Sequence, residues 1–107
     1  MENEITREEL HEKVVEVIKG IYDPEIPVSI WELGLIYDIQ ITELNEVVVL
    51  MTLTAPNCPE AEGLPVAVQF DINEIPEVKD CKVILTFDPP WDRSRMSEVA
   101  MLELGFF

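Results

Sequence analysis

The chain has 107 residues, of which 22 are acidic and 7 are basic, so its formal net charge at neutral pH is -15. Nucleic acids and anionic membrane surfaces both attract clustered lysine and arginine side chains, which this composition lacks, so we expect neither as a partner. The apolar fraction of 48% is typical of a folded protein, and the length is that of one domain spanning 1–107.

The first predicted element is a helix that opens with a capping box. Thr6 is followed three residues later by Glu9, a spacing that satisfies two backbone amides at a helix start. Apolar residues then recur at helical spacing, and Gly20 is a suitable stop. His11, the sole histidine, lies outside the apolar stripe and is expected at the surface. The apolar positions are Leu10, Val14, Val17, Ile18 and Ile21.

Two strands are predicted after the proline-rich run 23–27, which cannot be regular structure because its prolines remove donors and restrict their neighbours. Order resumes over 28–33, and Gly34 ends that segment. Residues 35–42 alternate as in a half-buried strand, and residues 47–53 form a second strand. The link over 43–46 is so short that the two strands must form an antiparallel hairpin.

The second half of the chain predicts a crossover connection. A helix is expected over 59–74, weakened near its start by Gly63 and Pro65 and closed by Pro76. A third strand over 79–88 carries Cys81, Val83, Leu85 and Phe87 on one face. The crossover should be right-handed and should place this strand parallel to the second. With a short last helix over 94–104, the fold class is α/β in an α+β two-layer arrangement, of order α-β-β-α-β, with a three-stranded mixed sheet.

Cys58 follows the second strand, in the run Thr54-Ala55-Pro56-Asn57-Cys58-Pro59. Pro59 suits the first helical position, because the amide hydrogen that it lacks would have no partner there. Cys58 would then be the N-cap at the positive end of the helix dipole, which lowers the pKa of a thiol and exposes its sulfur. The alternative is a small turn residue without chemistry.

Several residues are expected near Cys58, because a ligand crevice lies at the carboxyl ends of parallel strands. Asp88 and Trp91 follow the third strand, while Thr52 and Thr54 share one face of the second. Trp91 is either a lid on the core or an exposed anchor for a partner.

Cys81 begins the third strand, at the opposite edge of the sheet from Cys58, so we expect a buried thiol and no disulfide. Two cysteines without a dense framework, together with an acidic N-terminus that resembles no signal peptide, favour the cytoplasm.

Two carboxylates, Asp23 and Glu25, flank a proline in the first irregular segment. They could bind iron or steer a basic partner. Alternatively, Asp23 caps a turn and Glu25 is solvated, since aspartate often precedes turns.

Five sequence blocks, in this order, resemble the SufT-like metal–sulfur cluster biosynthesis family within the iron–sulfur cluster assembly domain superfamily. The resemblance runs from about Val14 to Gly105, nearly the whole chain. The blocks are Asp23-Pro24-Glu25-Ile26-Pro27, Leu33-Gly34-Leu35-Ile36-Tyr37, Met51-Thr52-Leu53-Thr54-Ala55-Pro56-Asn57-Cys58-Pro59, Phe87-Asp88-Pro89-Pro90-Trp91 and Met96-Ser97-Glu98.

The resemblance implies a small α/β domain that acts as an accessory factor in the maturation of iron–sulfur proteins. The family's functional cysteine falls on Cys58, its acidic motif on Asp23 and Glu25, and its aromatic motif on Trp91. The implied partners are cluster carrier or scaffold proteins, including carrier ATPases, and apo iron–sulfur proteins.

Iron–sulfur clusters are normally held by several thiolates. Cys58 alone cannot hold a conventional cluster, so we expect no stably bound cofactor and only transient contact of Cys58 with a cluster or iron. A homodimer could offer two Cys58 thiolates, with Asp23 or Glu25 completing the ligands, or a partner could supply the missing ones.

Two other classes of function are weighed against this one. A thiol-dependent enzyme needs a base beside Cys58, usually a histidine, and His11 has no reason to reach it, so we expect a non-enzyme. The other class is a protein adaptor, including an accessory factor of phenylacetate degradation, in which Cys58 is structural.

Overall fold

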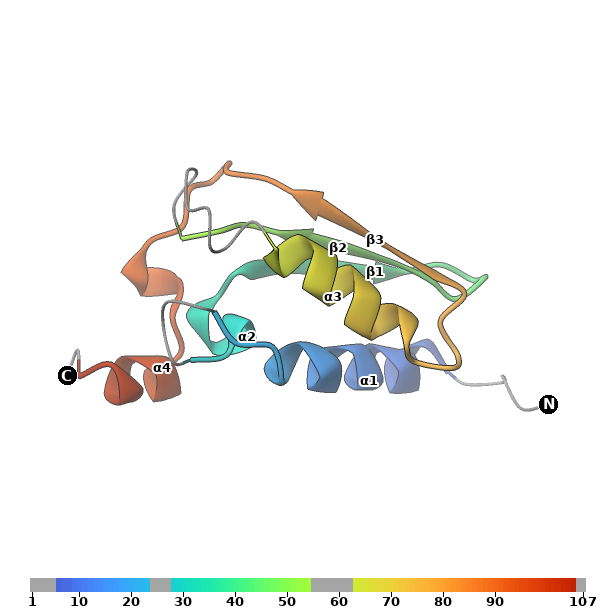
Figure 1. The fold of residues 1–107 in the computed structure, drawn as a ribbon, viewed down its shortest axis with the longest axis horizontal. Coiled ribbons are helices and arrows are strands. Elements are labelled where there is room, and N and C mark those ends of the chain that lie inside the picture. The colour runs from blue at the N-terminus through green and yellow to red at the C-terminus, as the bar shows by residue number, and fades with distance from the viewer. Residues whose placement is uncertain (1–5, 24–27, 55–62, 106–107) are drawn as a thin grey trace.

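The computed structural model describes residues 6–23, 28–54 and 63–105. In this part of the chain, α1 and α3 lie on the same side of a three-stranded sheet (Figure 1), so the predicted two-layer α+β class is confirmed. The strands are β1 (Ile36–Ile41), β2 (Glu46–Met51) and β3 (Asp80–Leu85). The helices are α1 (Arg7–Lys19), α2 (Ile30–Leu33), α3 (Leu64–Asn73) and α4 (Glu98–Glu103), with a short 3-10 helix at Arg93–Arg95.

Helix α1 begins and ends where the sequence predicts. The Thr6 hydroxyl accepts from the Glu9 amide at 3.0 Å, and the Glu9 carboxylate accepts from the Thr6 amide at 3.1 Å, which is the predicted capping box. Gly20 is the C-cap, and His11 is exposed as expected. No helix in the described ranges is long and apolar enough to cross a membrane.

The sheet has the predicted topology. β1 pairs antiparallel with β2, and β2 pairs parallel with β3, with Val47 opposite Cys81 and Met51 opposite Leu85. The hairpin turn contains Asn45 at φ +62°, a left-handed conformation that asparagine tolerates better than most residues. The Asn45 side-chain amide also donates to the Glu77 carbonyl at 3.1 Å, which ties the hairpin to the segment before β3.

Within the described residues, helix α3 begins at Leu64. Its N-cap is Gly63 and Pro65 lies in its first turn, while the turn that the sequence predicts from Pro59 falls in the range 55–62. Proline is tolerated in a first turn because the amide hydrogen that it lacks would have no helical partner there. The predicted irregularity around Gly63 and Pro65 therefore marks the start of the helix. Residues 55–62, including Cys58, lie outside the described residues.

The ends of β3 and of the last helix also differ from the prediction. Cys81 is buried and Val83 is half-buried, but Leu85 is 42% and Phe87 is 37% exposed, so the apolar face of this strand is covered at its start only. The strand ends at Leu85 and not at residue 88. The segment predicted as one helix over 94–104 is a 3-10 turn followed by α4, because Met96 between them is extended.

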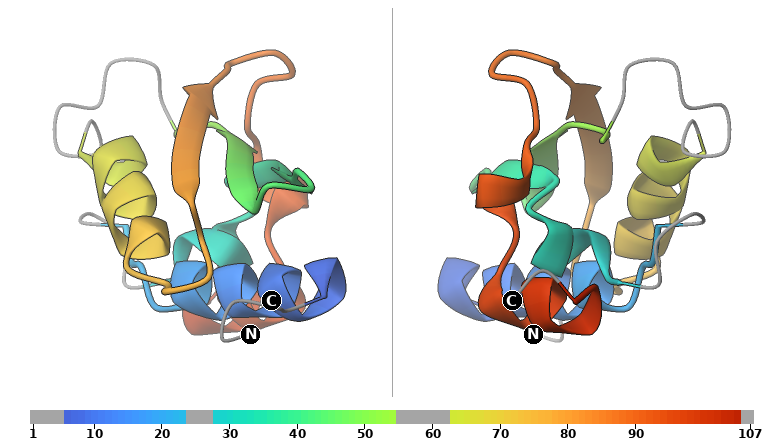
Figure 2. Two further views of the ribbon diagram at one scale, coloured as in Figure 1. Left: turned by 90° about the vertical axis from the view of Figure 1, so that its right-hand side faces the viewer. Right: turned by 90° about the vertical axis from the view of Figure 1, so that its left-hand side faces the viewer.

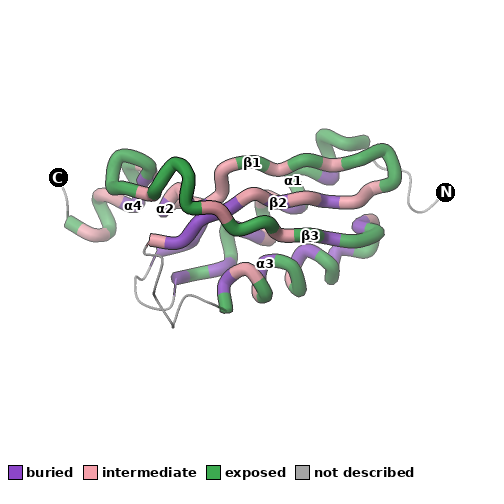
Figure 3. Tube along the Cα trace, turned by 90° about the horizontal axis from the view of Figure 1, so that it is seen from above, coloured by how far each residue is buried: buried purple, intermediate pink, exposed green. Residues whose placement is uncertain are grey.

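One hydrophobic core joins all of these elements. Alternate residues of β2 (Val47, Val49 and Met51) point into it, which gives the alternating burial along that strand in Figure 3. Their neighbours Val48 and Leu50 are half-buried on the other face, which lacks a helical layer in the described part of the chain. The packing against the helices therefore leaves one face of the sheet and the edge strand β3 accessible.

Candidate functional site at the carboxyl ends of the strands

The carboxyl ends of β2 and β3 lie at the same end of the molecule as α2 and the beginning of α3 (Figures 1 and 2). The segment that contains Cys58 connects β2 to α3, and the segment that contains Glu25 connects α1 to α2. Both Cys58 and Glu25 lie outside the described residues. The predicted site can therefore be followed through its described members: Asp23, Thr52, Thr54, Asp88 and Trp91.

Thr52 is a structural residue in this end of the sheet. It is fully buried, its amide donates to the Leu35 carbonyl at 2.8 Å, and its hydroxyl lies 3.4 Å from the Leu53 carbonyl. These contacts extend the pairing of β2 beyond Met51. Thr54 is half-buried at the entrance to the Cys58 segment, so it is the better placed of the two threonines for contact with a ligand.

Asp88 begins the loop after β3, which is hydrogen-bonded to β1. Thr86 continues the parallel pairing, with its amide donating to Met51, and its hydroxyl accepts from the Asp88 amide at 3.2 Å. The Tyr37 hydroxyl donates to the Pro89 carbonyl at 2.8 Å. The Asp88 side chain remains exposed. The loop is thereby held over the open face of the sheet.

A cavity of about 730 Å³ lies at this corner of the sheet. The Arg95 guanidinium sits 4.6 Å from the centre of the Tyr37 ring, a cation–π contact that helps to form its wall. The sequence pattern does not predict this contact, because it joins positions 58 residues apart in the chain. The lining residues are Gly34, Ile36, Tyr37, Leu50, Asp88, Pro89, Ser94 and Arg95.

Trp91 is a lid on the core. Its indole N–H donates to the Leu33 carbonyl at 2.7 Å, and its half-buried ring packs against the core cluster. A buried tryptophan usually satisfies its N–H in this way. Of the two interpretations drawn from the sequence, the geometry favours the core lid over the exposed partner anchor.

Asp23 is the last described residue before the range 24–27. It is 5% exposed, and its amide lies 3.3 Å from the Val28 carbonyl. The adjacent pair, Tyr22 and Ser29, forms an isolated antiparallel bridge. This placement fits the interpretation of Asp23 as a turn residue, and the interpretation of its carboxylate as an iron ligand stays a prediction.

Helix α2 follows Ser29 and is hydrogen-bonded to Ser97 before α4, a contact that the sequence pattern does not predict. The Ser29 hydroxyl caps α2 by accepting from Trp31 at 3.0 Å, and Gly34 ends it at φ +79°. The Ser97 hydroxyl donates to the Glu32 carboxylate, and the Ser97 amide donates to the Glu32 carbonyl at 2.9 Å. In the sequence, Ser29 before residues 30–33 and Gly34 after them are the residues that indicate the start and the end of this short helix.

Cys81 is the buried cysteine that the sequence predicts. It is 2% exposed, and desolvation, with a smaller contribution from the charge of Asp80, raises the pKa of its thiol to about 11. It pairs with Val47 at the start of β2, whereas Thr54 follows the end of that strand. Cys81 is therefore a protonated core residue at neutral pH, at the opposite end of the sheet from Thr54.

The part of the chain that the structure describes contains no group of three or more histidine, cysteine, aspartate or glutamate side chains able to hold a metal ion.

Comparison with known sequences identifies the family. A sequence model described as "Iron-sulfur cluster assembly protein" matches residues 11–85. This chain belongs to that family. A protein of Porphyromonas gingivalis named "Fe-S protein maturation auxiliary factor" is 46% identical to the chain over 106 residues, which cover 99% of both chains. The "Fe-S protein maturation auxiliary factor SufT" of Staphylococcus aureus is 35% identical over 85 residues, covering 79% of this chain and 97% of the relative.

A solved structure shows the same fold. The crystal structure of a domain of unknown function, DUF59, from Bacillus anthracis superposes with a TM-score of 0.86 at 35% identity, and the match covers 94% of this chain and 95% of that one. The SufT-like resemblance predicted from the five sequence blocks is thus confirmed, and so is the α+β architecture.

Proposed function

We propose that this protein is a non-catalytic auxiliary factor in the maturation of iron–sulfur proteins and that it acts through Cys58. The observation that carries the proposal is the end-to-end match to a relative named for this role, at 46% identity with 99% of both chains covered. A match of that extent leaves no room for an additional domain in the relative that could account for its activity. The role can therefore belong to the small domain itself.

The choice of Cys58 rests on the state of the other cysteine. Cys81 is buried, and its thiol remains protonated at neutral pH, so it is a poor nucleophile and a poor metal ligand. The chain has two cysteines, which leaves Cys58 as its remaining thiol. Cys58 lies between β2 and α3, and the crevice of such a sheet lies beyond the carboxyl ends of its parallel strands.

A single thiolate limits what the protein can do with a cluster. Because clusters are normally held by several cysteine thiolates, Cys58 would contact a cluster or iron as cargo while the other ligands come from a carrier, a scaffold or the apo-protein. Incomplete ligation by this chain suits a handover, because each ligand that it contributes must be released again. The proposed partners are accordingly cluster carrier or scaffold proteins and apo iron–sulfur proteins.

Deletion of the gene is expected to lower the activity of an iron–sulfur enzyme such as aconitase, because fewer enzyme molecules receive their cluster. The measurement is the specific activity of aconitase in extracts, normalised to the amount of aconitase protein. Malate dehydrogenase, which contains no cluster, is the control and should be unchanged. Re-expression of the wild-type chain should restore aconitase, and an undiminished aconitase activity in the deletion strain would contradict the proposal.

A further inference from the structure

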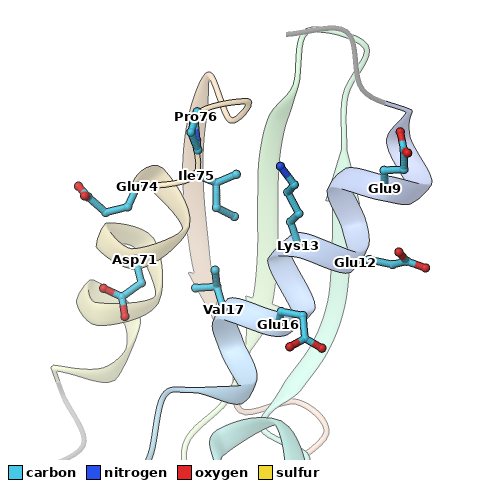
Figure 4. A pocket seen from close by; sticks show the side chains of 9 residues that line it. All are labelled: Glu9, Glu12, Lys13, Glu16, Val17, Asp71, Glu74, Ile75 and Pro76. Carbon is cyan, nitrogen blue, oxygen red and sulfur yellow. The ribbon is translucent and has the colours of Figure 1, made fainter. Parts of the chain in front are cut away.

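A groove of about 670 Å³ runs between α1 and the carboxyl end of α3, away from the end of the sheet where α3 begins. Figure 4 shows Val17 of α1 and Ile75, just after α3, between the two helices. With Pro76 they form an apolar floor.

Both walls of the groove are acidic. Glu12 and Glu16 project from α1, and Asp71 and Glu74 project from α3 (Figure 4). With Glu9, they make five carboxylates among the described lining residues, beside the single cation of Lys13.

The charge of Lys13 is already paired, because its Nζ lies 3.0 Å from the Glu77 carboxylate. This hydrogen bond is the main cause of a lowered pKa at Glu77, so the partner of Lys13 is ionised at neutral pH. The carboxylates that line the groove therefore gain no compensation from Lys13. In Figure 4 the side chains of Glu9 and Glu12 point to the outer side of α1 and that of Glu74 to the outer side of α3, so these carboxylates surround the groove and do not point into it.

We propose that this groove binds an amphipathic helix of a partner protein that carries lysine or arginine on its flanks and apolar side chains on its contact face. Helices dock into grooves through apolar anchors at i, i+3 or i+4 and i+7, which matches a floor of Val17, Ile75 and Pro76 between two helices. Basic flanking residues would meet the acidic walls, and opposite charges both accelerate association and select the partner.

The charge of the chain disfavours the other candidate occupants. A second copy also carries a net charge of -15 and would bring carboxylates to carboxylates. Nucleic acid would bring phosphates to the same walls. Because the groove involves the last turn of α3, a helix bound there would leave the carboxyl ends of β2 and β3 free for the Cys58 segment.

The test uses a fluorescein-labelled peptide of lysine and leucine in a helical amphipathic pattern, with fluorescence anisotropy as the readout. A scrambled peptide of the same composition lacks the apolar face, and we expect it to bind at least about tenfold more weakly than the patterned peptide. Raising the salt concentration should weaken binding, since exposed charges are screened. In two-dimensional amide NMR spectra of the whole chain, the largest shifts on addition of the peptide should fall near Val17 and Ile75.

The variant Glu16→Lys/Asp71→Lys reverses one charge on each wall. Its matched control, Glu43→Lys/Glu98→Lys, makes the same change in net charge at two exposed positions outside the groove. Thermal unfolding should confirm that both are folded.

The groove variant is expected to bind the patterned peptide at least about tenfold more weakly than wild type, and the control variant within about threefold. Equal weakening in both variants would overturn the proposal, because the peptide would then follow net charge alone. So would equal binding of the scrambled peptide, absence of binding by wild type, or self-association of wild type through the same residues.

Discussion

The Gly34→Ala variant is expected to lose about 2–4 kcal/mol of its free energy of unfolding, measured by urea denaturation. Gly34 ends α2 at φ +79°, a conformation in which a Cβ atom is strained. A Cβ built there would lie 2.2 Å from the Arg95 carbonyl oxygen and 2.8 Å from its carbonyl carbon. Because the obstacle is backbone, the segment of Arg95 would have to move away from α2.

Alanine variants of two other glycines distinguish the cost of a positive φ from the cost of the steric clash with Arg95. Gly105 has a similar φ of +75° but open space around its would-be Cβ, so Gly105→Ala should lose only the strain, about 1 kcal/mol. Gly20 has φ -90° and no close contact, so Gly20→Ala should be neutral or slightly stabilising. Comparable losses in Gly34→Ala and Gly105→Ala would mean that the close approach of Arg95 contributes little.

Trp91→Ala is expected to lose about 2–3 kcal/mol, somewhat less than the loss for a fully buried aromatic residue, because the ring is half-buried. The indole links the loop after β3 to the Leu33 carbonyl at the end of α2, so its removal loosens two elements at once. The measurement is again the free energy of unfolding in urea.

Trp91→Phe keeps most of the ring and removes the N–H, so its expected loss is about 1 kcal/mol from the hydrogen bond to Leu33. An exposed partner anchor would behave differently, because its replacement would leave stability unchanged. Near-wild-type stability of Trp91→Ala would therefore contradict the role of Trp91 as a core lid.

Local patterns predict the sheet and α1 because their signals are short-range. The capping box at Thr6, the helical stripe and the short link over 43–46 lie within a few residues of the structures that they specify. The parallel pairing of β2 with β3 follows from the crossover. These features depend on hydrogen bonds and burial within one element or between consecutive elements.

The structural features that the sequence pattern does not predict depend on contacts between residues far apart in the chain. The approach of Arg95 to Gly34, and its position over Tyr37, join residues far apart in the chain. The sequence pattern does not choose between Pro59 and Pro65 as the first-turn residue of α3, because both are suitable there. The alternation of apolar residues predicts a buried face for β3, but it does not show whether a helix packs against the whole length of that face, and Leu85 and Phe87 are exposed.

The sequence predicts at which end of the sheet the described candidate residues lie, but it does not predict which of them are buried. Asp88 and Trp91 follow β3 at the edge where β2 also ends, as the topology requires. Thr52 and Asp23 are nevertheless buried, because polar side chains in turns and strand extensions satisfy the backbone there as readily as they face a ligand. The assignments of Cys58 and Glu25 stay predictions.

The most direct test of the central claim is the rescue of aconitase activity in the deletion strain by Cys58→Ala, compared with wild type at equal protein abundance. His11→Ala is the matched control, since His11 is exposed and lies on α1. We expect full rescue by wild type and by His11→Ala and no rescue by Cys58→Ala, with all three proteins equally stable. Full rescue by Cys58→Ala would contradict a role for the thiol in cluster handling and would make the protein an adaptor.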